Sequence, residues 1–253
     1  MTPPPTTAII LAAGMGTRLR DVHSGAPKGL LRIDGETLVE RSLRLLRQAG
    51  IERVILVTGY RAEDYAPLPA RWPELELIHN GGYEDNGSMA SMALALIALR
   101  EDEDFLVLES DLFYEARALT VLLASVHRDV VLTSGPTGAG DEVWVQTQHG
   151  VLETMSKNRK AVECHGEFVG ICRLSAPTGQ AMETSYRAFV DRHGHGRMSY
   201  ETDALLQVSH PITVHQEPSL LWGEIDNADH YTRVLEHLAP KIRAKAQSAA
   251  SEV

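Results

Sequence analysis

Cysteine, positive charge and long hydrophobic runs are all scarce in this sequence. Its two cysteines, Cys164 and Cys172, are too few for a disulfide framework and lack the paired spacing of a zinc site. Asp and Glu residues number 34 against 24 Lys and Arg residues, and the formal net charge of −10 argues against a protein that coats nucleic-acid phosphates. No stretch approaches the roughly 20 apolar residues that cross a bilayer, so we exclude insertion into a membrane.

A secretion signal is missing from the N-terminus as well. Residues 1–5 carry no basic side chain, and the apolar run over residues 8–13 is too short for a signal core. Together with the scarcity of cysteine, this predicts a cytoplasmic protein. The chain has 253 residues, of which 43% are hydrophobic and 23% are charged, and these values are typical of one folded, enzyme-sized domain.

The first half of the sequence alternates strand and helix patterns. Residues 7–13 predict a buried strand, because the run is short, β-branched at its centre and stopped by Gly14. Apolar residues recur over 37–49 with the spacing of one helix face, and Gly50 suits the helix C-terminus. Further strands are expected over 51–57, 75–78 and 105–109, and a further helix over 88–99. This alternation predicts βαβ units, and therefore a Rossmann-like α/β fold with a mixed, mostly parallel sheet flanked by helices.

Beyond Asp111 the alternation of helix and strand patterns continues as far as residue 134, and then the pattern changes. Helices are expected over 115–127, 176–191, 200–208 and 228–237, and strands over 130–134 and 212–215. A glycine-rich loop over 135–140 precedes strand patterns at 142–145, 151–155 and 168–174, which predict a small antiparallel insertion. The polar, alanine-rich stretch 241–253 is either a frayed helix or disordered.

The sharpest motif follows the first predicted strand. It reads Leu11-Ala12-Ala13-Gly14-Met15-Gly16-Thr17-Arg18-Leu19, with Pro27-Lys28 further on. Glycines let backbone N–H groups close around phosphate oxygens, and Arg18 and Lys28 add positive charge. The motif lacks the Gly-Lys-Ser/Thr of a Walker A loop, and Leu19 stands where a dinucleotide fingerprint needs its third glycine. The alternative is a tight strand-to-helix turn beside two solvated basic residues.

Acidic residues end two further apolar stretches. Asp111 closes Glu109-Ser110-Asp111 after the strand at 105–109, and Asp226 closes Glu224-Ile225-Asp226. Ligands of open α/β sheets bind at the carboxyl ends of strands, and carboxylate oxygens suit Mg²⁺. We therefore predict that Asp111 and Asp226 hold Mg²⁺. The alternatives are that Asp226 only caps the helix at 228 and that Asp111 only forms a turn.

With these motifs the sequence resembles the nucleoside-triphosphate transferase family, whose signature is Gly-x-Gly-x-Arg and then Pro-Lys after the first strand. The resemblance runs over nearly the whole chain and is closest to cytidylyltransferases that act on phosphocholine or on phosphonates such as 2-aminoethylphosphonate. The stretches 109–111 and 200–203 look more like the phosphonate branch. The resemblance implies the nucleotide-diphospho-sugar transferase fold, with one domain over 1–240 and a polar tail over 241–253. Within that domain, about 6–134 would bind the nucleotide and about 135–238 the acceptor.

The resemblance also implies which residues meet the nucleotide. They are Leu11, Ala12, Ala13, Gly14, Met15, Gly16, Thr17, Arg18, Lys28, Asn80, Asn86, Gly87, Ser88 and Glu109. The loop 80–88 would contact the pyrimidine base, because backbone carbonyls and amide side chains can distinguish cytosine from uracil. Gly87-Ser88 stands where the family usually has an Asn-Asn pair. The alternative role of Ser88 is to cap the helix that follows.

A third group of residues is expected at the acceptor. Trp144, Tyr200 and Trp222 would form an aromatic wall for an ammonium group, with Lys157 on the phosphonate. Glu167 and Asp203 would bind an amino group. Val143 takes the place of the tryptophan that phosphocholine enzymes carry, and this shift changes the strand face on which Trp144 lies. Trp144 is alternatively a core residue, and Lys157 a solvated turn residue.

These expectations combine into a Mg²⁺-dependent cytidylyltransferase that joins CTP to a small phosphonate or phosphate acceptor and releases pyrophosphate. Arg18, Lys28, Asp111 and Asp226 would be its catalytic residues. The alternatives are a phosphocholine cytidylyltransferase, a sugar-1-phosphate nucleotidylyltransferase or molybdopterin-type guanylyltransferase, and a non-catalytic nucleotide-sensing domain. No nucleic-acid or membrane partner is expected, and a homodimer is left open.

Overall fold

A nine-stranded sheet forms the centre of the protein. The structure is a computed structural model that describes residues 3–19 and 25–251. The strand order is β5-β4-β1-β6-β11-β8-β12-β10-β9. The strands of this sheet are β1 (Thr7–Ala12), β4 (Arg53–Thr58), β5 (Leu75–His79), β6 (Phe105–Glu109), β8 (Val130–Ser134), β9 (Trp144–Gln148), β10 (Val151–Ser156), β11 (Gly166–Leu174) and β12 (Thr213–Glu217).

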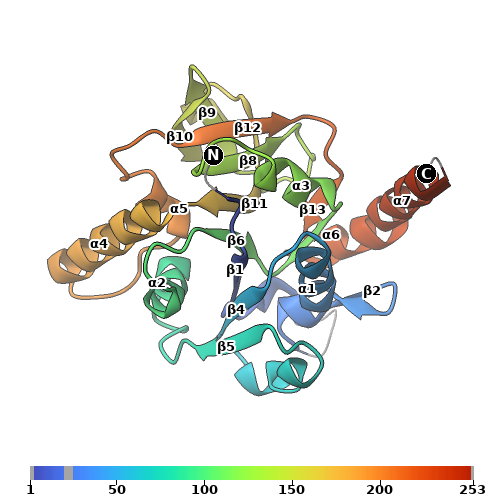
Figure 1. Cartoon of the computed structure of the whole chain (residues 1–253), viewed down its shortest axis with the longest axis horizontal. Helices are drawn as coiled ribbons and strands as arrows, with labels where there is room; N and C mark the ends of the chain where they lie inside the picture. The colour runs from blue at the N-terminus through green and yellow to red at the C-terminus, as the bar shows by residue number, and fades with distance from the viewer. Residues whose placement is uncertain (1–2, 20–24, 252–253) are drawn as a thin grey trace.

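Helices cover both faces of this sheet (Figure 1). They are α1 (Leu38–Gln48), α2 (Ser88–Ala98), α3 (Arg117–Leu123), α4 (Ala176–His193), α5 (Glu201–Leu205), α6 (Ala228–Arg233) and α7 (Ala239–Ser251). Two small ladders complete the fold, one between β2 (Arg32–Ile33) and β3 (Glu36–Thr37), the other between β7 (Leu112–Tyr114) and β13 (Trp222–Glu224).

The strands β5, β4, β1 and β6 pair in parallel and form one half of the sheet. Every residue of β1 is buried, and its side chains alternate between two cores. Ala8 and Ile10 pack with residues of α1 and α3, whereas Ile9 and Leu11 pack with residues of α2 and α4. A continuous apolar run therefore forms a strand here, because helices cover it from both sides.

Strand β11 joins the two halves of the chain. It lies antiparallel between β6 and β8, and its first residues also pair with β9. Its register shifts between Phe168 and Cys172, where Gly170 has a φ of +78° that favours glycine. The acceptor side expected over 135–238 is thus continuous with the sheet of the nucleotide side.

The predicted α/β class and mixed sheet are confirmed, and most predicted elements lie within a few residues of those observed. The helix predicted over 115–127 is shorter, because Glu115 is held by Leu221 and the Ser125 hydroxyl accepts the N–H of His127 in a turn. The strand expected over 142–145 begins at Trp144. The helix expected over 228–237 ends at Arg233, continues as a π-helical turn, Val234–Leu238, and leads into α7.

The stretch 241–253, expected as a frayed helix or disordered tail, is helical to Ser251, and residues 252–253 lie outside the described part. Helix α7 is anchored at its start, where Ile242 is buried and Lys245 and Arg243 pair with Glu115 and Asp34. Within the described residues, no helix combines the length and apolar character needed to cross a membrane.

Candidate active site

Two adjoining cavities open at the carboxyl ends of β1 and β6. One has a volume of about 290 Å³ and is lined by the glycine loop, and we call it the glycine-loop cavity. The other has a volume of about 350 Å³, and we call it the Glu167 cavity. Glu109, Lys157, Tyr200 and Glu224 line both, so the two cavities meet at these side chains.

The two glycines of the loop, Gly14 and Gly16, are needed for different structural reasons. Gly16 has a φ of +55°, and a Cβ there would stand 2.9 Å from Cγ of Lys28. A Cβ on Gly14 would meet nothing within 4 Å, so this glycine leaves open space in the cavity. Among the residues expected at the nucleotide, Leu11, Ala12, Ala13, Gly14, Gly16 and Arg18 line the cavity. Met15 and Thr17 are not among its lining residues, and their contact with the nucleotide stays a prediction.

The four residues predicted to be catalytic come together in the glycine-loop cavity. Lys28 Nζ donates to Asp111 Oδ2 over 2.8 Å and also to Asp226 Oδ1. Arg18 Nη2 lies 3.0 Å from the same Asp226 oxygen. Burial alone would lower the pKa of Lys28, but the two carboxylates outweigh it and hold that pKa well above its usual value.

The ladder between β7 and β13 places the two aspartates side by side. Glu224 pairs with Leu112, and the backbone N–H of Ile225 donates to the carbonyl of Asp111 over 3.0 Å. Asn227, not Asp226, caps α6, because its side chain accepts the N–H of His230 over 2.9 Å. The carboxylate of Asp226 is therefore free to face Lys28, and the capping role considered for it is wrong.

Three further acids surround this pair. Oxygens of Glu109, Asp111 and Glu224 lie within 4.8 Å of one another, and so do oxygens of Asp141, Glu224 and Asp226. Burial, followed by the neighbouring negative charges, raises the pKa of Glu109 and of Glu224 well above the usual range. Burial also opposes ionisation of Asp226, but Lys28 more than offsets it and holds the pKa of Asp226 below its usual value.

These carboxylates fit a divalent cation. Oxygen ligands are those that Mg²⁺ prefers, and Asp111 Oδ1 is buried with no hydrogen-bond partner among the described residues. Sequence reasoning gave Glu224 and Asp141 no metal role. The signal for Glu224 was its place two residues before Asp226 at a strand end, where alternate residues share a face. Asp141 carried no such signal, because it lies in an irregular loop.

The loop predicted to meet the base lines the same cavity through Asn80, Asn86, Gly87 and Ser88. The Asn80 amide donates to Ser91 Oγ over 3.0 Å, and its oxygen accepts the N–H of Gly82. Ser88 bonds to Glu201 and is the first residue of α2, so Gly87 is the N-cap and the capping role considered for Ser88 is wrong.

The Glu167 cavity collects all but one of the residues expected at the acceptor. Lys157, Glu167, Tyr200, Asp203 and Trp222 line it, whereas Trp144 does not. The Trp144 ring instead packs against the Arg159 guanidinium, 5.2 Å from the ring centre. The two residues before it, Glu142 and Val143, line the cavity, and contact of Trp144 with an acceptor stays a prediction.

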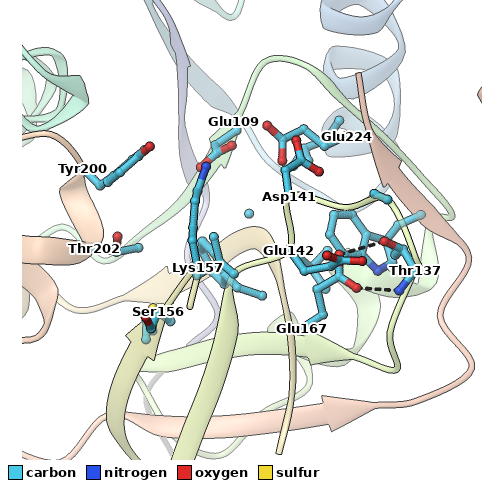
Figure 2. Close-up of a pocket in the computed structure, with 18 of the residues that line it drawn as sticks. Glu109, Thr137, Asp141, Glu142, Ser156, Lys157, Glu167, Tyr200, Thr202 and Glu224 are labelled. Atoms are coloured by element: carbon cyan, nitrogen blue, oxygen red, sulfur yellow. Dashed lines mark hydrogen bonds between the residues drawn. The ribbon is translucent and has the colours of Figure 1, made fainter. Parts of the chain in front are cut away.

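Several polar side chains of this cavity have a defined neighbour (Figure 2). Both oxygens of Glu167 accept from Thr137, one from its backbone N–H over 2.5 Å and one from its hydroxyl over 2.8 Å. Burial raises the pKa of Glu167 to about 7. Trp222 Nε1 donates to Ser134 Oγ over 2.6 Å, and Lys157 Nζ lies 5.2 Å from the ring centre of Tyr200.

Glu142 is a cavity residue that sequence reasoning did not assign to the acceptor. Its carboxylate has no hydrogen-bond or ion-pair partner within the described parts of the chain, and Figure 2 shows it beside Glu167. Asp203, by contrast, accepts the backbone N–H of Tyr200 over 3.2 Å. Glu142 thus adds an uncompensated negative charge to a cavity that also holds Lys157.

Comparison with curated sequences finds similarity to cytidylyltransferases. A 2-aminoethylphosphonate cytidylyltransferase of Lancefieldella rimae is 35% identical over 107 residues, which span 42% of this chain and only 43% of that protein's length. A choline-phosphate cytidylyltransferase of Haemophilus influenzae is 25% identical over 256 residues, covering 92% of this chain and 97% of that protein.

Comparison with solved structures supports the fold. The inositol-1-phosphate CTP transferase from T. maritima superposes with a TM-score of 0.79 at 21% identity, covering 96% of this chain and 98% of that one. The CTP:phosphocholine cytidylyltransferase from Streptococcus pneumoniae gives a TM-score of 0.71 at 21% identity, covering 91% and 97%. At these identities the likeness concerns the fold.

The MobA-like NTP transferase domain matches residues 8–215. The chain therefore belongs to the MobA-like NTP transferase family and is an enzyme of the nucleotidyltransferase type.

Proposed function

We propose that this enzyme is a Mg²⁺-dependent cytidylyltransferase that transfers CMP from CTP to a small phosphonate of the 2-aminoethylphosphonate kind. The observation that carries the proposal is the placement of Lys28 and Arg18 against Asp111 and Asp226 in the glycine-loop cavity, which adjoins the Glu167 cavity. The names of the Lancefieldella and Haemophilus relatives support CTP as the donor. Nucleotidyltransferases of this fold generally use a divalent metal, and the acidic groups here fit one.

In the proposed reaction, an oxygen of the phosphonate attacks the α-phosphorus of CTP. A new P–O bond forms there, and the bond to the β-phosphate oxygen breaks, so that pyrophosphate leaves with the bonding electrons. The phosphonate oxygen is already ionised near neutral pH, and no protein group needs to take a proton from it. The task of the protein is to align two anions and to offset their charge.

The described residues divide this task between them. Backbone N–H groups of the glycine loop and the Arg18 guanidinium hold the β- and γ-phosphates, and Lys28 faces the α-phosphate or the attacking oxygen. Asp111 and Asp226, with Glu224 beside them, would hold Mg²⁺, which when bound supplies positive charge against the triphosphate. Lys157 stands where the two cavities meet and binds the phosphonate of the acceptor.

The acceptor end of the cavity favours a primary ammonium group. A primary ammonium has N–H donors, and Glu142 and Asp203 offer carboxylate oxygens to receive them. A quaternary ammonium has no donor and is held best by aromatic faces. Since Trp144 lies outside the cavity, only Tyr200 and Trp222 of the expected aromatic wall remain. Phosphocholine stays the second candidate because of these two rings.

The test is pyrophosphate release with Mg²⁺, measured for each nucleoside triphosphate against each acceptor of a panel. The panel contains 2-aminoethylphosphonate, the same phosphonate without its amino group, phosphocholine and sugar 1-phosphates. Release confined to CTP with 2-aminoethylphosphonate supports the proposal. Release with phosphocholine selects the second candidate, and sugar phosphates with another base indicate a sugar-1-phosphate nucleotidylyltransferase. Nucleotide binding without release from any pair indicates a nucleotide-sensing domain and overturns the proposal.

A further inference from the structure

The glycine-rich loop over residues 135–141 forms one wall of the Glu167 cavity. Thr137, Ala139 and Asp141 of this loop line the cavity. Gly138 and Gly140 between them have φ angles of +71° and +98°, a region that favours glycine. The loop belongs to no helix or strand, so its shape depends on the side chains that reach it from elsewhere.

His230 reaches the loop from the first turn of α6. Its Nε2 lies 3.1 Å from the carbonyl oxygen of Ala139, and its Nδ1 accepts the backbone N–H of Asp226 over 3.4 Å. A carbonyl can only accept and a backbone N–H can only donate, so the neutral ring that satisfies both carries its proton on Nε2. The residue is 5% exposed. His230 therefore connects Asp226 to the loop through one buried and one half-buried contact.

Arg233, almost one turn further along α6, holds the loop at a second point. Its Nη1 donates to the carbonyl oxygen of Thr137 over 3.0 Å. Thr137 in turn donates its N–H and its hydroxyl to Glu167 of β11, as the dashed lines in Figure 2 show. One series of contacts thus runs from Asp226 through α6 and the loop to the far side of the cavity.

We propose that His230 and Arg233 are positioning residues for the acceptor, because they fix the loop 135–141 as a wall of the Glu167 cavity and tie it to Asp226. The proposal rests on the proposed function, since it takes this cavity to be the acceptor site. Neither side chain is among the described residues that line the two cavities. Their loss should therefore act on acceptor binding through the loop and leave the triphosphate contacts in place.

His230→Asn is the variant that isolates the loop contact. The asparagine oxygen can replace Nδ1 as acceptor for Asp226, but the side chain is too short to reach Ala139. Steady-state pyrophosphate release is measured with CTP and with the acceptor varied in turn. We expect the acceptor KM to rise roughly tenfold, because the half-buried carbonyl of Ala139 loses its donor and the free-energy cost of that loss corresponds to about this factor. The kcat and the CTP KM should stay within about threefold. His230→Gln, whose amide N–H can take the place of Nε2, should recover most of the loss.

Two further variants perturb the same loop, and a third serves as the control. Gly138→Ala adds a Cβ that meets nothing within 4 Å, so it strains only the backbone of the loop and should raise the acceptor KM as well. Arg233→Gln should also raise the acceptor KM. If the His230→Asn protein does not fold, Gly138→Ala or Arg233→Gln takes its place in the test. His237→Asn, at an exposed histidine just beyond α6, should leave both KM values unchanged.

The outcomes separate this inference from the function on which it rests. An unchanged acceptor KM in folded His230→Asn and Gly138→Ala overturns the positioning role, and so does an equal rise in both KM values. Absence of pyrophosphate release by the unsubstituted enzyme with every pair is a different result. In that case the proposed function fails first, and the positioning role falls with it.

Discussion

Lys28 Nζ lies 2.8 Å from Asp111 Oδ2, although the two residues are 83 positions apart. One positive charge is shared between two buried carboxylates, since the same ammonium also contacts Asp226. Without Lys28 these carboxylates would repel each other in a poorly solvated place. The lysine proposed to serve the phosphates therefore also holds together the pair proposed to bind the metal.

Replacing this lysine should affect both activity and stability. We expect Lys28→Ala to lower kcat by about 100-fold or more, as the loss of a preorganised charge donor does. The same variant should lower Tm, because two buried acids lose their counter-charge, and Mg²⁺ should restore part of that loss. Pyrophosphate release and thermal melting, each with and without Mg²⁺, check both effects. The exposed Lys160→Ala is the matched control, and a Lys28→Ala enzyme within a few-fold of the unsubstituted rate would remove Lys28 from the mechanism.

Removing one carboxylate charge should abolish the metal response and spare the fold. Asp111→Asn keeps the shape of the side chain and an oxygen for Lys28, but it takes away a charged ligand of the proposed site. We expect Mg²⁺-dependent turnover to fall about 100-fold or more and Mn²⁺ binding, followed by electron paramagnetic resonance, to weaken. Asp102→Asn, in an exposed turn, should change neither. Normal turnover of Asp111→Asn at the same Mg²⁺ concentration would contradict the assigned metal site.

The two loop glycines should respond differently to the same substitution. Gly14→Ala adds a Cβ into open space, so the free protein should keep its Tm while the CTP KM rises by roughly tenfold or more. Gly16→Ala should lower Tm, because its φ is +55° and the new Cβ would press on the Lys28 side chain. Thermal melting and CTP titration of both variants make the comparison. Equal losses of Tm in the two variants would contradict this difference, and Gly14 would then be required for folding in the same way as Gly16.

The grouping of the four proposed catalytic residues was predictable from the sequence because each of them belongs to a local signal. Gly14 to Arg18 follow a strand that is apolar over residues 8–12, and Asp111 and Asp226 each end an apolar stretch. In parallel sheets such ends meet at one edge, so the motifs alone indicate a common site. The close approach of Lys28 to Asp111 also depends on the glycine that follows Lys28 in the sequence. A Cβ on Gly29 would stand 2.7 Å from Val39 and 3.3 Å from Ser110, so only glycine lets Lys28 come this close.

The acceptor side was harder to predict because it depends on register and on loops. Trp144 is absent from the lining of the Glu167 cavity although it pairs with Glu167 across the ladder, because its ring packs against the Arg159 guanidinium instead. The ladder that brings Asp226 to Asp111 has only three residues in each strand, too few for a periodic signal. The bonds from Thr137 to Glu167 and from His230 to Ala139 begin or end in an irregular loop, whose path no hydrophobic pattern fixes.

The carboxyl group of Glu167 should give the stability of this protein a specific pH dependence. Burial raises its pKa to about 7 in the folded protein, whereas a glutamate in an unfolded chain has a pKa of about 4.3. Between these values the folded protein binds the proton more tightly than the unfolded chain does. The contribution of this group to stability is therefore full below about pH 4.3 and is lost as the pH rises to about 7.

Glu167→Gln makes that contribution measurable, because an amide cannot ionise and its oxygen still accepts from Thr137. The Tm of this variant, relative to the unsubstituted protein, should increase between pH 5 and pH 8. Glu52→Gln, at an exposed position, corrects for the general loss of one acid from an acidic protein. If the Tm difference for Glu167→Gln runs parallel to that for Glu52→Gln across this range, then Glu167 is ionised throughout. In that case Glu167 would be a second full negative charge beside Glu142, and the cavity would attract an ammonium group more strongly than the raised pKa implies.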